Sequence, residues 1–211
     1  SSPPSAGGFF LTRALLSAFW YNQTATARER RRTRSGGEPS SLKSFAPVRW
    51  FFYDWFMKQP DDVFYMGEAL KEAEEALKHG EVPVGAVVVR NGEIVGRGRN
   101  GREEAFDISS HAEINAMKDA AKRLGRWDLS DCSLYVTLEP CLMCAGAILQ
   151  ARVRYLCFGA CDEKAGAVVS NFYVFDSKNA YTPPLIDKNV LKNECECILK
   201  TFFGKRRLEE R

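Results

Sequence analysis

The chain has 211 residues, of which 45% are hydrophobic and 27% charged, a composition typical of one globular domain with a full core. Its net charge at pH 7 is only +3, and this charge is unevenly distributed. Residues 1–56 carry eight basic groups against three acids, a net +5, which leaves −2 for residues 57–211. The overall basicity is therefore no evidence for nucleic-acid binding by the domain. No apolar run reaches the 18 or more residues that a membrane helix needs.

Residues 1–56 differ in composition from the rest of the chain. They are rich in Ser, Gly and Arg, poor in acids, and end in an aromatic cluster at 50–56. We expect this segment to be an extension that is poorly ordered or non-native, followed by a compact domain at 57–211. An organelle transit peptide is the alternative, because such peptides share this composition.

The seven cysteines and the start of the chain bear on the compartment. The cysteine count is odd, and no secretory signal peptide opens the sequence. Both features favour a reducing compartment, the cytoplasm. If residues 1–56 are a genuine transit peptide, the compartment is a plastid or mitochondrion.

Hydrophobic periodicity and turn residues predict the elements of the domain. In chain order they are a helix at 61–79, strands at 84–89 and 93–99, a helix at 111–124, a strand at 133–138, a helix at 141–151, a strand at 153–158 and a last helix at 187–207. Asn91-Gly92 predicts a two-residue hairpin turn. Ser109 or Ser110 is a candidate N-cap, and Pro140 suits a first helical position. This order indicates an α/β sandwich with a mixed sheet.

Two short motifs, His111-Ala112-Glu113 and Pro140-Cys141-Leu142-Met143-Cys144, bring together residues that bind zinc. One imidazole and two thiolates leave the fourth tetrahedral position open to water, as in catalytic rather than structural zinc sites. Cys141 and Cys144 lie one turn apart at a predicted helix start, where the helix dipole and unpaired amides lower the pKa of a thiol. Both sulfurs therefore share one face of the helix.

Glu113 lies two residues after His111, near the expected metal without having to bind it. We expect it to take a proton from water, pass it to a ring nitrogen and protonate the leaving ammonia. The alternative is a structural zinc knuckle with Glu113 solvated. That alternative needs a fourth ligand, and His79, the only other histidine, suits a helix end instead.

The pattern H-x-E…P-C-x-x-C is similar to the signature of the zinc nucleobase deaminases. From about Val63 to Arg207 the chain also resembles the bacterial tRNA adenosine deaminases, in runs that include 82–87, 111–114, 135–141, 143–148, 158–160 and 202–207. The stretch after Cys144 is more discriminating than the zinc motifs, because it continues in the tRNA-type pattern for over twenty residues. The resemblance implies a cytidine deaminase-like fold, a three-layer α/β/α sandwich around a mixed five-stranded sheet. It further implies a homodimer that converts the wobble adenosine of an arginine tRNA to inosine.

The same resemblance implies roles for particular residues. One Zn²⁺ per subunit would be held by His111, Cys141 and Cys144, with Glu113 as proton shuttle. Asn100 would hydrogen-bond the flipped base, although an Asn that ends a strand is also an ordinary turn residue. Val84 would line the base pocket or simply belong to the core.

Basic residues near the predicted site are candidate contacts for RNA phosphates. They are Lys164, Lys205, Arg206 and Arg207. The last three also suit the dipole at a helix C-terminus. In addition, Cys161 occupies a position where the family usually has arginine.

Two other functions remain open from the sequence. Zinc motifs alone define only the reaction class, so a deaminase of a free base or nucleoside, such as guanine or cytidine, is one alternative. The other is a non-catalytic RNA-binding subunit. Such a subunit is expected to lose the shuttle carboxylate, and Glu113 is present.

Overall fold

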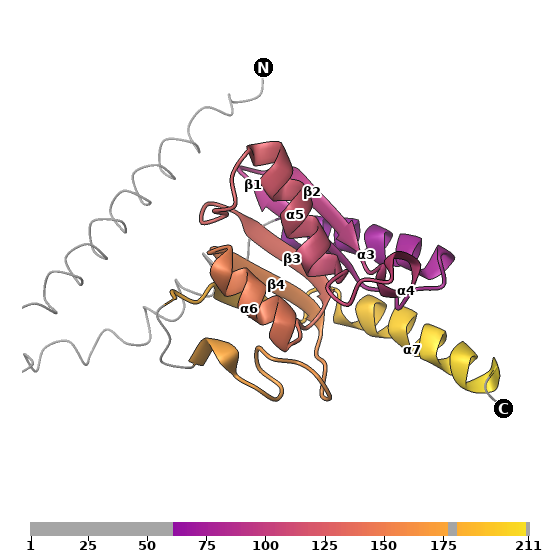
Figure 1. The fold of residues 1–211 in the computed structure, drawn as a ribbon. Helices are drawn as coiled ribbons and strands as arrows, with labels where there is room; N and C mark the ends of the chain where they lie inside the picture. The colour runs from indigo at the N-terminus through magenta and orange to yellow at the C-terminus, as the bar shows by residue number, and fades with distance from the viewer. Residues whose placement is uncertain (1–60, 177–180, 210–211) are drawn as a thin grey trace, which may run out of the picture. The chain divides into compact units, whose positions relative to one another are not determined.

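The computed structural model describes residues 61–176 and 181–209 (Figure 1). The expected extension at 1–56 lies outside the described residues and stays a prediction. The elements are α3 (Asp62–Lys78), β1 (Gly85–Arg90), β2 (Glu93–Arg99), α4 (Arg102–Ala105), α5 (Ala112–Leu124), β3 (Ser133–Leu138), α6 (Leu142–Gln150), β4 (Tyr155–Ala160), the 3₁₀ turn η3 (Val174–Asp176), β5 (Leu185–Lys188) and α7 (Lys192–Glu209).

The five strands form one mixed sheet in the order β2-β1-β3-β4-β5. β1 pairs antiparallel with both β2 and β3, whereas β3–β4 and β4–β5 are parallel. Asn91 and Gly92 both have positive φ, which confirms the predicted tight hairpin between β1 and β2. The parallel pairs need crossover connections, and the helix α6 supplies the first of them.

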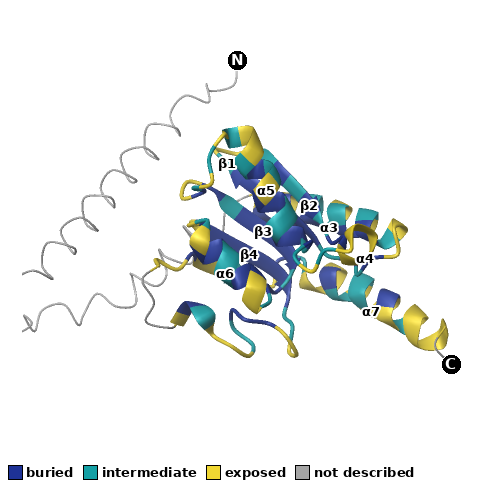
Figure 2. Ribbon diagram, in the orientation of Figure 1, coloured by how far each residue is buried: buried dark blue, intermediate teal, exposed yellow. Residues whose placement is uncertain are grey.

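Helices cover both faces of the sheet, so the predicted three-layer sandwich is confirmed. α5 and α6 pack on one face, and α3 and α7 on the other (Figure 1). Each interface has its own apolar cluster, and the three central strands β1, β3 and β4 between them are mostly buried (Figure 2). The start of α3 is fixed by buried Asp62, whose carboxylate accepts hydrogen bonds from the hydroxyls of Tyr135 and Tyr155.

The backbones of α3 and α5 lie close to the backbone of the sheet, because glycines of the sheet stand at the contacts. Gly98 of β2 faces the backbone of α5 at Ala112 and Ala116, and Gly85 of β1 faces α3 in the same way. A methyl group at either glycine would collide with helix backbone. These contacts fix the height of α5 above the sheet, and with it the position of the first turn of α5.

The end of the chain departs from the prediction. The expected helix at 187–207 begins only at Lys192, because residues 185–188 form β5 and pair with β4. The sequence pattern of β5 is too short to be distinguished from the start of a helix, and its pairing partner is 30 residues away along the chain.

Two predicted helix starts are also corrected. α5 has His111 as its N-cap residue rather than a serine, and Ser110 Oγ accepts a hydrogen bond from Asn115 instead. α6 begins at Leu142 with Cys141 as N-cap, so Pro140 precedes the cap and is not the first helical residue. Both shifts place a predicted metal ligand at the N-cap itself.

Candidate active site

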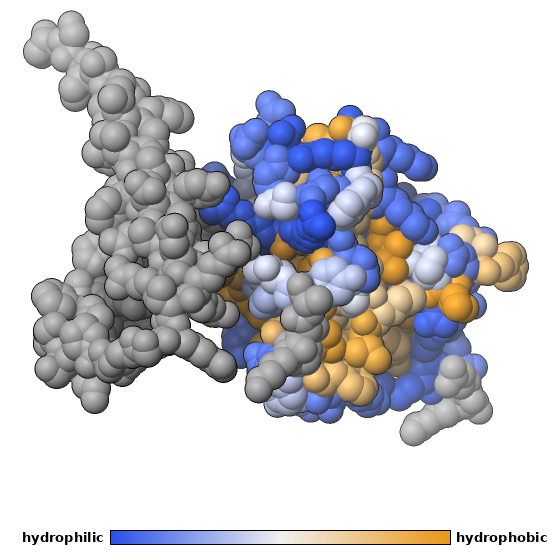
Figure 3. Space-filling view, turned by 60° about the vertical axis from the view of Figure 1, so that its left-hand side comes forward, coloured by the Kyte–Doolittle hydropathy of each residue, from blue (hydrophilic) through white to orange (hydrophobic). Residues whose placement is uncertain are grey.

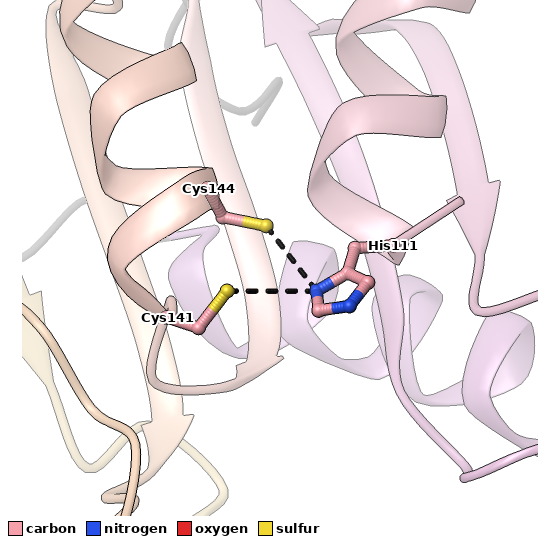
Figure 4. Close-up of side chains that lie close together, drawn as sticks. All are labelled: His111, Cys141 and Cys144. Atoms are coloured by element: carbon pink, nitrogen blue, oxygen red, sulfur yellow. Dashed lines mark hydrogen bonds between the residues drawn. The ribbon is translucent and has the colours of Figure 1, made fainter. Parts of the chain in front are cut away.

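The three predicted metal ligands come together where α5 and α6 begin (Figure 4). Sγ of Cys141 and Sγ of Cys144 lie 3.6 and 3.5 Å from Nδ1 of His111. All three ligand atoms lie within 4.8 Å of one another. Helix starts leave backbone amides unpaired, and those amides favour negative sulfur ligands at this point.

The geometry fits a tetrahedral metal ion. With zinc–sulfur and zinc–nitrogen bonds of about 2.3 and 2.0 Å, the S···N edge of a tetrahedron is about 3.5 Å. The two observed S···N distances match this edge. Among the described residues no fourth His, Cys, Asp or Glu joins the group, as an open catalytic site requires. His79 ends α3, with Nδ1 2.9 Å from the backbone oxygen of Glu75.

The electrostatics of the cluster favour a cation. The hydrogen bond with Cys144 lowers the pKa of the Cys141 thiol to about 3. The same bond, together with burial, raises the pKa of the Cys144 thiol. The hydrogen bond with Cys141 raises the pKa of His111. A site that already carries a thiolate at neutral pH attracts a divalent metal ion.

Glu113 lies beside the cluster in the first turn of α5 and is 4% exposed. Burial is the main cause that raises its pKa, and the nearby negative charge of Cys141 adds to the effect. A carboxylate with a raised pKa is a better proton acceptor at neutral pH than an ordinary glutamate. Its position and environment therefore suit a proton shuttle.

A small cavity of about 190 Å³ opens next to the cluster. Its lining includes His111, Glu113 and Cys141, together with Asn100 and Val84. Ligand pockets for drug-sized molecules are roughly 300–1,000 Å³, so this one suits a single ring system. Val84 is half-buried; it lines the cavity and also packs against the core.

The basic candidates are only partly brought to the pocket. Arg206 lines it and lies over the ring of Phe202, 5.4 Å from the ring centroid. Lys205 and Arg207 are exposed in the last turns of α7 without lining the pocket. Lys164 is exposed between the pocket-lining residues Asp162 and Ala165.

Sequence reasoning missed two buried glutamates that hold the surroundings of the site. Glu81 accepts hydrogen bonds from Nδ2 of Asn100 at 3.1 Å and from the backbone N–H of Glu104 at 2.8 Å. Glu139 accepts five hydrogen bonds from the loop that follows β4, at Asp162, Val168, Val169 and twice at Ser170. Burial alone raises the pKa of Glu139, but these hydrogen bonds outweigh it and hold that pKa below its usual value.

The fold and the site together define a class of protein. The chain has a mixed five-stranded sheet between helix layers, with a His-Cys-Cys cluster and a buried glutamate at two helix starts. This combination defines a hydrolytic deaminase of the cytidine deaminase-like fold.

Comparisons with known proteins narrow this class. The family model of the MafB19-like deaminases matches residues 60–207. The tRNA-specific adenosine deaminase of Streptococcus pyogenes serotype M1 is 41% identical over 143 residues, 68% of this chain and 84% of the relative. That of Haemophilus influenzae is 45% identical over 147 residues, 69% of this chain and 85% of the relative. The chain belongs to the tRNA-specific adenosine deaminase family.

A solved structure supports the same assignment. It comes from biochemical and structural studies of A-to-I editing by tRNA:A34 deaminases at the wobble position. The two chains are 41% identical with a TM-score of 0.63, over 64% of this chain and 99% of the other. The match therefore includes nearly the whole of the other chain.

Proposed function

We propose that the protein converts the wobble adenosine in the anticodon of an arginine tRNA to inosine by hydrolytic deamination. The observation that carries this proposal is the 41–45% identity to tRNA-specific adenosine deaminases over about two thirds of the chain. The site adds the chemistry, since His111, Cys141 and buried Glu113 line one cavity sized for a base. A single-stranded anticodon loop makes it inexpensive to turn the base out of its stack.

In this proposal His111, Cys141 and Cys144 hold one Zn²⁺. When bound at such a site, zinc lowers the pKa of a water molecule to about 7 and so makes it nucleophilic at neutral pH. Glu113 takes one proton from the attacking water and delivers it to the ring nitrogen next to the reacting carbon. It then takes the remaining proton of the added hydroxyl and gives it to the amino group, which leaves as ammonia while the carbonyl forms. The enclosed position of Glu113 keeps bulk water from competing for that proton.

The remaining site residues select and hold the substrate. Asn100 hydrogen-bonds the flipped base, and Val84 packs against its ring. Arg206, which lines the cavity, contacts a phosphate next to the flipped nucleotide in this proposal, and exposed Lys164, Lys205 and Arg207 are further candidates for phosphate contacts.

Direct detection of inosine tests the proposed function. The full-length, zinc-loaded protein is incubated with an arginine tRNA that carries adenosine at the wobble position, and inosine is detected by sequencing. We expect conversion at that position alone. Failure on this tRNA combined with ammonia release from guanine or cytidine would show a free-base or nucleoside deaminase instead.

Glu113→Ala tests the proton shuttle. We expect the variant to fold and retain one zinc per subunit while its turnover falls by several orders of magnitude. Glu74→Gln is the matched control, because Glu74 is exposed on α3. Turnover that survives in Glu113→Ala would remove this carboxylate from the mechanism.

We further propose a homodimer. A shallow groove between α5 and α6 is lined mainly by apolar side chains, including Met117, Trp127 and Ala147. Apolar residues also gather over part of the molecular surface (Figure 3). A second copy of the chain would bury such surface in a two-fold interface. The molar mass measured by light scattering tests this: we expect a dimer for the wild type and a monomer for Trp127→Glu, because the Trp127 side chain is exposed in this groove.

The compartment is proposed on the state of the cysteines. All seven are unpaired thiols, which favours a reducing compartment such as the cytoplasm. A plastid or mitochondrion replaces it if residues 1–56 are a transit peptide. No helix within residues 61–176 and 181–209 is long and apolar enough to cross a membrane.

A further inference from the structure

Glu81 is a buried carboxylate for which the proposed chemistry has no use. It is 1% exposed and lines the same cavity as Asn100 and His111. Its two oxygens have different partners: Oε2 accepts from Nδ2 of Asn100, and Oε1 accepts from the backbone N–H of Glu104. Burying a carboxylate is costly unless it is well paired, so its place at the cavity needs a physical reason.

Backbone hydrogen bonds fix both residues of the Glu81–Asn100 contact. Gly80 has φ +74°, and the N–H groups of Gly80 and Glu81 donate to the oxygens of Leu77 and Ala76, which is the Schellman ending of a helix. On the other side, the β1–β2 pairing is continued by a hydrogen bond from the Asn100 N–H to the Val84 oxygen. The Glu81–Asn100 contact therefore joins two fixed points.

This contact determines which end of the Asn100 amide is left for a ligand. The amide nitrogen donates to Glu81, and within the described residues no group donates to Oδ1 of Asn100. Among the described residues, every fully buried side-chain nitrogen or oxygen has a hydrogen-bond partner. Oδ1 of Asn100 has none among these residues, so this atom is partly accessible. A rotation of the amide by 180° would place Oδ1 against the carboxylate, and two acceptors repel each other.

We propose that Glu81 is a positioning residue that fixes the Asn100 amide so that its carbonyl oxygen is the hydrogen-bond acceptor available to the substrate. This inference rests on the proposed function, in which Asn100 contacts the flipped nucleoside. A donor group on that nucleoside, an amino or a hydroxyl hydrogen, is what such an acceptor selects. Glu81 thus acts on substrate selection through Asn100, without touching the substrate.

Replacement by glutamine separates this role from mere support of the fold. In Glu81→Gln the backbone N–H of Glu104 cannot reverse, so the new side chain keeps its carbonyl there and turns its NH₂ toward Asn100. The Asn100 amide then has to rotate, which brings its NH₂ in place of its oxygen to the cavity. The support of α4 is kept, while the polarity presented to the substrate is inverted.

A double-mutant cycle measures the consequence on the full-length, zinc-loaded protein. Glu81→Gln alone is expected to lower kcat/KM about 10- to 100-fold, the usual effect of one mispaired buried polar group. Asn100→Asp alone sets two carboxyls against each other, and one must take up a proton. In the double variant the glutamine NH₂ donates to one aspartate oxygen and the other oxygen is the acceptor again. We expect it to be at least tenfold more active than either single variant.

Glu104→Gln is the matched control, because it removes a charge from α4 without touching the Glu81–Asn100 bond. Its side chain is 51% exposed and pairs with Arg99 at the surface. Thermal midpoint and zinc content are measured for every variant. A double variant no more active than the single ones, with normal zinc content and stability, would overturn the inference.

A measurement without substrate keeps this test independent of the proposed function. In ¹⁵N-labelled wild-type protein, one proton of the Asn100 side-chain amide should exchange slowly because it is bonded to a carboxylate. Glu81→Gln should remove that protection, whereas Glu104→Gln should leave it intact. Unchanged exchange in Glu81→Gln would refute the orientation of the amide, even if the wild type deaminates tRNA. Loss of tRNA deamination by the wild type would refute the function and leave this result standing.

Discussion

A methyl group added at Gly98, which is not a site residue, should lower the stability of the protein and displace α5, which carries His111. A Cβ at Gly98 would lie 2.9 Å from the carbonyl carbon of Asn115 and closer still to the backbone at Ala112 and Ala116. Ordinary carbon contacts are about 3.5 Å, so α5 would have to retreat from the sheet by about an ångström. Overpacking of this kind costs about 1–3 kcal/mol, and backbone on both sides places Gly98→Ala at the upper end.

The displacement would also reach the metal ligands. His111 is the N-cap of α5, and its Nδ1 lies at tetrahedral-edge distances from both sulfurs. Metal sites tolerate errors of only about 0.2 Å in ligand distance, so a shift of about an ångström should weaken zinc binding at least tenfold. Loss of stability and loss of metal therefore have a common cause in Gly98→Ala.

Urea unfolding and metal release measure the two effects. Gly67→Ala is the control, because the same methyl group meets nothing within 4 Å at this position inside α3. It should stabilise the protein by about 0.5–1 kcal/mol through helix propensity. Zinc release to a chromophoric chelator should be faster in Gly98→Ala only. Equal unfolding free energies for Gly98→Ala and the wild type would refute the close-packing argument.

Two other perturbations address the metal and the loop after β4. Chelation of zinc should abolish deamination and lower the Tm by several degrees, because a ligand that binds only the folded state stabilises it; a Tm insensitive to the chelator would argue against a metal at His111. Glu139→Gln should cost about 1–3 kcal/mol, since an NH₂ group then faces backbone N–H donors. Hydrogen exchange at Val169 and Ser170 should accelerate in that variant, and unchanged protection would show that the carboxylate does not hold the loop.

The metal ligands could be predicted from the sequence because their chemistry is local. A Cys-x-x-Cys pair at a helix start places both sulfurs on one face. His111 and Glu113 are likewise held within the start of one helix, α5. The structure brings His111, Cys141 and Cys144 together as expected. The longer periodic elements were predicted for the same reason, since their periodicity repeats within one segment of the chain.

What the sequence could not predict depends on partners far away in the chain. β5 is a strand because it pairs with β4, and its four residues carry little periodicity of their own. Glu81 and Glu139 look like ordinary surface acids beside Val82 and Pro140. Their burial follows from backbone and side-chain donors that lie 19 to 31 positions away. A pattern in a single sequence cannot predict that a carboxylate is buried when its hydrogen-bond donors come from another loop.

Glu81 is separate from the residues that are proposed to carry the chemistry of this site. His111, Cys141, Cys144 and Glu113 interact with one another, so a change in one of them disturbs the reaction itself. Within the described residues, the hydrogen bonds of Glu81 go to Asn100 and Glu104 and not to that group. With the proposed role of Asn100, we expect a change in the Glu81–Asn100 pair to alter the hydrogen-bonding pattern offered to the base while the metal ligands stay in place. Because zinc motifs of this kind define only the reaction class, differences among deaminases in the base they accept are expected at pairs of this type rather than at the metal.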